Sequence, residues 1–69
     1  MTLQDYHEKM LQVGRQALAV VVNNIDALLL CDRIEDNVLE ILEQSNLINF
    51  ILEDIEHHLS IFKGLITPN

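Results

Sequence analysis

The 69-residue sequence is poor in residues that cross-link, turn or anchor small folds. It contains one cysteine, one proline, two glycines, two phenylalanines, one tyrosine and no tryptophan. Because Cys31 is alone, an internal disulfide is excluded, and no cysteine–histidine pattern predicts a structural zinc site. A short chain without such a staple commonly gains stability by associating with another subunit. A single thiol is also typical of a reducing compartment, so we expect a cytoplasmic protein.

Basic residues and long apolar runs are scarce as well. Four Lys and Arg residues stand against eleven Asp and Glu residues, which gives a formal net charge of -7. This charge argues against nucleic acid and anionic membrane surfaces as partners. The longest apolar run, residues 17–22, is far too short for a membrane span, so no membrane insertion is expected. No signal peptide is expected either, because residues 1–11 include Asp5, Glu8 and Lys9.

A heptad pattern dominates residues 34–66. Two series of residues recur every seven positions and are offset by four; they are Ile34, Ile41, Ile48, Ile55 and Phe62, and Val38, Ser45, Leu52, Leu59 and Ile66. An α-helix places both series on one stripe, whereas a strand would scatter them over two faces. The pattern predicts a long amphipathic helix with a coiled-coil-like seam. Ser45, the polar member, is either a register device or a small residue that lets helices approach.

An earlier helix is predicted over about residues 3–30, with an apolar face that covers roughly half its circumference. Thr2 followed by Asp5 resembles a capping box at its start. Gly14 and the pair Asn23-Asn24 are weak helix formers, and the sequence leaves open whether they break the helix.

The second helix is predicted over about residues 33–63. Asp32 with Glu35 resembles a capping box, and Gly64 suits the left-handed position that ends a helix. The alternative is one uninterrupted helix through residues 31–33. Two helices joined by a short turn should pack antiparallel, so we predict an all-α, single-domain helical hairpin over residues 1–69 that completes a helix bundle with a second chain. The residues expected to hold the hairpin together are Val21, Leu28, Ile48, Ile55 and Leu59.

Several apolar residues of the second helix lie off the seam. Leu39, Phe50 and Ile61 are spaced by eleven residues, close to three helical turns, so they share a face with Leu47 and Leu65 beside them. Contiguous exposed apolar surface usually marks an interface. We therefore predict these five as partner-binding residues, with a larger helical chaperone or a second copy of the chain as the protein partner.

The sequence offers little for catalysis. His57 and His58 lie among acidic residues, and the Asp54–His57 spacing matches a ligand pattern of di-iron bundles. The first helix supplies no inward carboxylate to complete such a site, so a solvated charged face is the preferred interpretation. No nucleophile–base set, glycine-rich phosphate loop or basic aromatic patch is present. We predict no enzyme activity, no cofactor, no metal and no small-molecule substrate.

Residues 37–59, NVLEILEQSNLINFILEDIEHHL, combine an apolar-Glu-x-x-Glu-Gln segment with an isoleucine-rich turn. This stretch resembles the second helix of the small helical-hairpin co-chaperones of type III secretion systems. The resemblance implies a chain that pairs with a larger, repeat-helical chaperone and helps to keep the needle subunit unpolymerised in the cytoplasm. The turn departs from the family, because it is short and reads CDRIED where the family often has a polar segment containing Gln and Tyr.

The function predicted from these patterns is a noncatalytic protein-binding module that stabilises or assembles a partner. One alternative is a small acidic regulator that inhibits a basic protein target through the Asp and Glu side chains of the second helix. Another is a structural protein that forms a homodimeric four-helix bundle.

Overall fold

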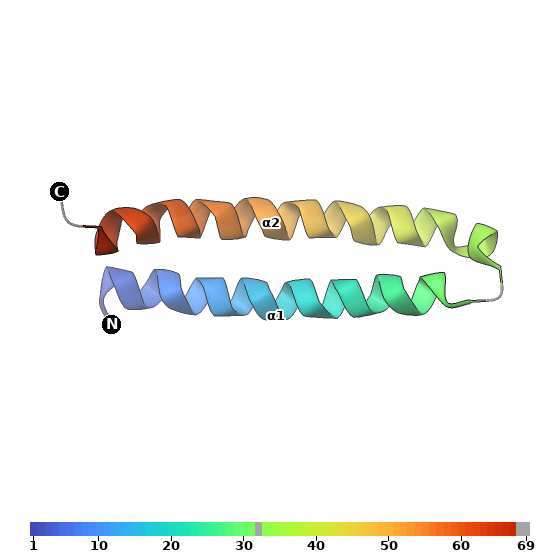
Figure 1. Cartoon of the computed structure of the whole chain (residues 1–69), viewed down its shortest axis with the longest axis horizontal. Helices are drawn as coiled ribbons and strands as arrows, with labels where there is room; N and C mark the ends of the chain where they lie inside the picture. Colours follow the sequence, from blue (N-terminus) through green and yellow to red (C-terminus); the bar gives the residue numbers. More distant parts are fainter. Residues whose placement is uncertain (32, 68–69) are drawn as a thin grey trace.

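The computed structural model describes residues 1–31 and 33–67 and shows two long helices packed antiparallel (Figure 1). Helix α1 spans Leu3–Leu29, a 3₁₀ turn η1 spans Ile34–Asn37, and helix α2 spans Val38–Ile66. The hairpin is a rod of 53 × 17 × 14 Å, with the start of α1 and the end of α2 at one end and the turn at the other. The predicted all-α helical hairpin is confirmed.

Helix α1 begins at a capping box. The Asp5 backbone N donates a hydrogen bond to Thr2 Oγ1 at 3.0 Å, and the Thr2 backbone N donates to Asp5 Oδ2 at 3.3 Å. These bonds satisfy backbone donors that the start of a helix leaves without partners. The helix then continues through Gly14 and the Asn23-Asn24 pair, so neither of these weak helix formers breaks it.

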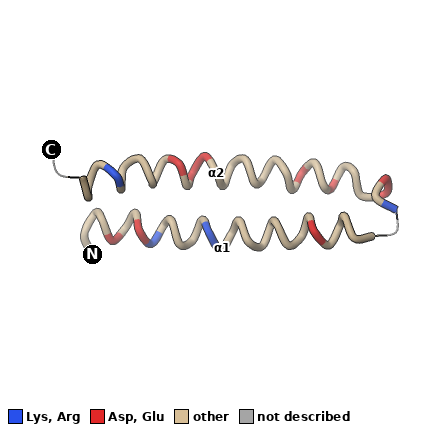
Figure 2. Tube along the Cα trace, in the orientation of Figure 1, with Lys and Arg blue, Asp and Glu red and all other residues tan. Residues whose placement is uncertain are grey.

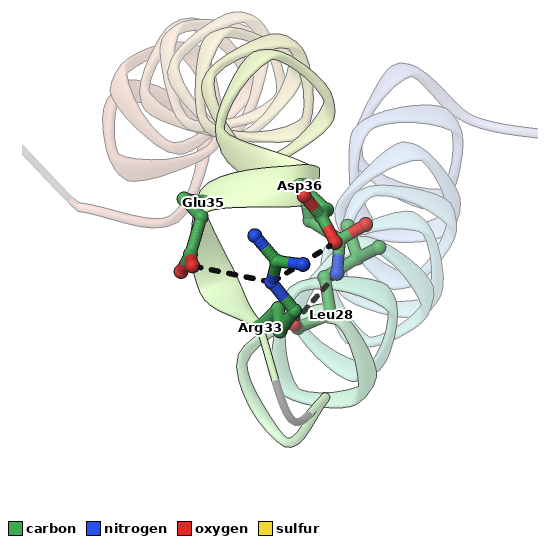
Figure 3. A network of polar contacts seen from close by, with 5 residues as sticks. Leu28, Arg33, Glu35 and Asp36 are labelled. Atoms are coloured by element: carbon green, nitrogen blue, oxygen red, sulfur yellow. Dashed lines mark hydrogen bonds and ion pairs between the residues drawn. The ribbon is translucent and has the colours of Figure 1, made fainter.

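Side chains on both sides hold the turn together. Asn37 Nδ2 donates a hydrogen bond to the Leu28 carbonyl oxygen at 3.3 Å, which joins the start of α2 to the last turn of α1. Arg33 Nε lies 3.3 Å from a Glu35 carboxylate oxygen and 3.7 Å from one of Asp36 (Figure 3). All three side chains are well exposed, so these ion pairs contribute about 1 kcal/mol or less. The predicted cap at Asp32 falls outside the described residues.

Helix α2 continues beyond its predicted end at Lys63. Gly64 lies within the helix, which runs to Ile66, and its φ is not positive. The prediction of a left-handed stop at Gly64 is therefore wrong. The Thr67 backbone N donates to the Lys63 carbonyl oxygen at 3.1 Å, so helical hydrogen bonding is kept across the glycine. A glycine within a helix costs only about 1 kcal/mol, which such bonding offsets.

The interface between the helices is narrow. On α1 the inward row has a seven-residue period, in which His7, Gly14 and Val21 are buried and Leu28 is half-buried. Among the described residues Val21, 8% exposed, is the one buried hydrophobic residue. At Gly14 the helices come close together, because a Cβ atom there would lie 2.7 Å from Ile55 Cγ1. A single hairpin therefore buries little apolar surface.

Helix α2 faces α1 with only half of the predicted seam. One row is inward, since Ile41, Ile48, Ile55 and Phe62 are half-buried, although Ile34 at its start is exposed. The other row does not face α1. Its apolar members are between 44% and 52% exposed; they are Val38, Leu52, Leu59 and Ile66. The prediction that Leu59 helps to hold the hairpin is wrong, whereas the other four residues named for that role lie in the interface or beside it.

Polar contacts explain this rotation of α2. The second inward row is Asn37, Gln44, Ile51 and His58. His58 meets His7 of α1, Gln44 Oε1 lies 3.5 Å from Asn24 Nδ2, and Asn37 bonds to Leu28. The Ser45 hydroxyl instead donates to the Ile41 carbonyl oxygen of its own helix at 2.9 Å. Helix α2 is thus rotated so that its polar partners, and not its second apolar row, meet α1.

Candidate functional site

The predicted partner-binding residues lie along α2, and α1 leaves most of them uncovered. Leu39 and Phe50 are the most accessible, at 78% and 70% exposed. Leu47 and Leu65 are also exposed, and Ile61 is half-buried. We call these five residues the α2 stripe. Four of its members are accessible to another molecule.

Phe50 is surrounded by polar side chains. It lines an open hollow on the surface together with Asn46, Asn49 and Glu53. An aromatic ring within a ring of amide and carboxylate groups is typical of the anchor residues of protein interfaces. Fully burying a Phe side chain stabilises a complex by about 1.5–3 kcal/mol. This part of the α2 stripe therefore has the composition of a protein-binding surface.

A second feature, a histidine pair, joins the two helices near their free ends. His7 of α1 and His58 of α2 are each 6% exposed, and their Nδ1 atoms lie 2.7 Å apart. At that distance one Nδ1 carries a hydrogen and donates a hydrogen bond to the lone pair of the other Nδ1, so the accepting ring is neutral. The rings of Tyr6 and His57 pack edge-on against His7 and His58 respectively.

The surroundings of the pair favour a neutral His7. Burial, and then the nearby His58 and His57, lower the pKa of His7 below its usual 6.5. Asp54 Oδ1 lies 3.6 Å from His58 Nε2, so Asp54 is placed to pair with His58 when that ring is protonated. The cluster is thus arranged to hold the ends of α1 and α2 together when His7 carries no charge.

The Asp54–His57 spacing in this cluster matches a metal-ligand pattern, but the structure arranges these side chains differently. Asp54 approaches His58, four residues further on, and not His57, which the sequence spacing singled out. Within residues 1–31 and 33–67, no group of three or more His, Cys, Asp or Glu side chains is placed to hold a metal ion. Cys31 is exposed beside the turn, with its Sγ 3.6 Å from the Ala27 carbonyl oxygen. The buried histidines are accounted for as packing groups of the hairpin.

The sequence interpretation missed both His7 and the inward role of Gly14. The signal was present, because His7, Gly14, Val21 and Leu28 are spaced by seven residues. Only two of these four residues are large and apolar, so a search for apolar periodicity passes over the row. A search for any seven-residue row that includes a glycine would have found it.

Comparison of the chain with protein-family models, with curated proteins and with solved structures finds no match. No helix in the described ranges is both long enough and apolar enough to cross a membrane.

Proposed function

We propose that this chain is a noncatalytic module that binds a larger helical protein through the α2 stripe. The observation that supports this most directly is the exposure of Phe50 and Leu39, which are less covered than most apolar side chains of the chain. Their exposure contrasts with the hairpin interface, which buries one hydrophobic residue among those described. Covering the stripe gives a hydrophobic gain that folding of the single chain leaves unused.

We further propose that the partner is a chaperone of helical repeats, as in the type III secretion co-chaperones that residues 37–59 resemble. A helix with apolar residues at helical spacing is a common form in which one protein enters the apolar groove of another. Glu53 beside Phe50 favours a groove with a basic rim. In this role the chain would act in the cytoplasm and stabilise its partner without performing chemistry.

Phe50→Asp tests the stripe. We expect the tagged variant, expressed in its native cells, to lose the protein that co-purifies with the unchanged chain at fixed stoichiometry. Its helical circular dichroism should be kept, because Phe50 is mostly exposed. Asn23→Asp adds the same charge at an exposed position of α1 and serves as the matched control. Unchanged co-purification with Phe50→Asp would refute the stripe as the binding surface.

The dependence on salt separates this proposal from that of an acidic regulator of a basic target. At an ionic strength near 1 M the Debye length falls to about 3 Å, so a complex held by charge dissociates. A complex held by Phe50 and Leu39 should survive and even strengthen in sulfate salts, which favour apolar burial. Loss of the partner in a few hundred millimolar sodium chloride would favour the regulator.

A further inference from the structure

The hairpin has a second apolar face on the side away from the α2 stripe. Consider the inward row that contains Val21 on α1 and the one that contains Ile48 on α2. In an antiparallel pair, the residues one and four positions after each of these rows lie on one side of the hairpin, because a helix that runs in the opposite direction also turns in the opposite sense. We call this side the broad face. Its apolar members are Leu11, Leu18, Val22, Ile25 and Leu29 on α1, and Val38, Leu42, Leu52, Leu59 and Ile66 on α2.

Most of the broad face is accessible in the single hairpin. Val22 and Leu29 on α1 and all five members on α2 are exposed, with Leu42 at 55%. The rod outline of 53 × 17 Å corresponds to an area of about 900 Å² per copy, close to the roughly 800 Å² per partner of a standard stable interface. The face is therefore large enough to support a stable dimer.

Charged residues border the broad face in a self-complementary order. The edge on α1 reads Glu8, Arg15, Val22 and Leu29 from the free end toward the turn. The edge on α2, read in the same direction, is Lys63, Glu56, Asn49 and Leu42. Within the part of the chain that the structure describes, none of the four charged side chains forms an ion pair.

Between these charges the hairpin has an uncharged middle. Residues 16–25 of α1 and 44–52 of α2 contain no Asp, Glu, Lys or Arg. The contact between Asn24 and Gln44 shows that the two stretches lie side by side, and Figure 2 shows them without charge along the centre of the rod. No like charges therefore face each other across the centre of the broad face, although each chain carries a net charge of -7.

We propose that a second copy of this chain covers the broad face and forms a four-helix bundle with both turns at the same end. In that bundle α1 lies beside α2 of the second copy, antiparallel to it. Glu8 then faces Lys63 of the second copy, and Arg15 faces Glu56, so both edges pair opposite charges. Near the turn, Leu29 meets Leu42 of the second copy. Two-fold symmetry makes each of these contacts occur twice.

The lean of the side chains selects these pairs. Because His7 contacts His58 and Gly14 lies against Ile55, positions that are level across the hairpin have numbers that sum to about 67, so Glu8 is level with about residue 59 of the second copy, between Glu56 and Lys63. Helical side chains lean toward the N-terminus of their own helix. In antiparallel helices, Glu8 and Lys63 therefore lean toward each other, and Glu56 leans away from Glu8 toward Arg15.

Other arrangements lack this complementarity. With the two turns at opposite ends, α1 would lie beside α1, and Arg15 would stand near Arg15 of the second copy. On the side of the α2 stripe, the positions just before the inward rows of Val21 and Ile48 carry only acidic charges on α2 and no charge on α1, so no opposite charges can pair there; the acidic residues are Glu40 and Asp54. The inference does not depend on the function proposed above: Asn49 borders both the hollow around Phe50 and the broad face, but Phe50 and Leu39 are not members of the broad face.

The position of the turns is tested with a nitroxide label on the native Cys31, which is exposed. Packed helices lie about 8–10 Å apart, so two labels at the same end should be within about 30 Å by pulsed electron resonance. With the turns at opposite ends, the labels would be separated by about the 53 Å length of the rod. A distance near that length, or a chain that sediments as a monomer at all concentrations, overturns the proposal.

The charge pairs are tested by reversal and exchange. We expect Glu8→Lys and Lys63→Glu each to weaken dimerisation by about tenfold, since each pair occurs twice, and the double variant to restore it. Glu53→Lys and Lys9→Glu make the same charge changes outside the broad face and should leave the dimer constant within about twofold. A double variant that is weaker than either single variant contradicts the pairing.

Discussion

Replacing Gly14 with alanine has two opposing effects on the stability of the hairpin. Alanine favours a helix over glycine by about 1 kcal/mol. The added methyl group would lie 2.7 Å from Ile55 Cγ1 and 3.2 Å from Ile55 Cδ1, well inside ordinary carbon–carbon contact. Cγ1 is bonded to the branched β-carbon, so Ile55 cannot relieve the contact by moving only its tip. Such overpacking costs about 1–3 kcal/mol, so Gly14→Ala should destabilise the hairpin by up to about 2 kcal/mol.

Urea unfolding followed by circular dichroism, at one protein concentration, measures this loss. Gly64→Ala is the matched control, because Gly64 lies within α2 and a Cβ atom there would meet nothing within 4 Å. We expect the control to gain up to about 1 kcal/mol. In a chain that already carries Ile55→Ala, Gly14→Ala should also become stabilising by about 1 kcal/mol. If Gly14→Ala stabilises the unaltered chain as much as Gly64→Ala does, the close approach of the helices is refuted.

Two further predictions concern the free end of the hairpin. Thr2→Ala removes the acceptor for the Asp5 backbone N and should cost about 1 kcal/mol in urea unfolding, whereas an unchanged midpoint would show that the cap contributes nothing. Because the pKa of His7 is lowered on folding, the unfolded chain binds this proton more tightly, so stability should fall as the pH falls below 6.5. His7→Gln should flatten that slope between pH 6.5 and 5; an equal slope in both chains would contradict the assignment.

The sequence predicted both α-helices, because the signals were local, but residues 34–37 form a 3₁₀ turn and the second α-helix begins at Val38, not near residue 33 as predicted. The capping box at Thr2 and Asp5 depends on residues three positions apart, and the structure contains both of its hydrogen bonds. The residue at which α2 ends could not be predicted from its local sequence in the same way. Gly64 permits both a left-handed stop and continued helix, and the bond from Thr67 to Lys63 decides for the helix.

The rotation of α2 could not be predicted from its own pattern. A seven-residue period shows which residues share a stripe, but what the stripe faces depends on contacts across the interface. Here His58 and Gln44 find polar partners on α1, and Gly14 lets Ile55 approach. These contacts involve polar and small residues, and a prediction based on the spacing of large apolar residues does not take them into account.

The rotation of α2 leaves the second row of the seam uncovered, and packing within one hairpin does not explain why that row is apolar. If the seam served only to hold α2 against α1, its second row would be buried, yet Leu52 and Leu59 are about half exposed. In a four-helix bundle each helix packs against two neighbours, and its two rows of core residues point between those neighbours. The row of Ile48 and Ile55 then meets α1, and the row of Leu52 and Leu59 meets the second copy. On this reasoning Phe50→Asp should leave dimerisation unchanged and Glu8→Lys should leave partner binding unchanged, because Phe50 is not part of the broad face and Glu8 is not part of the α2 stripe.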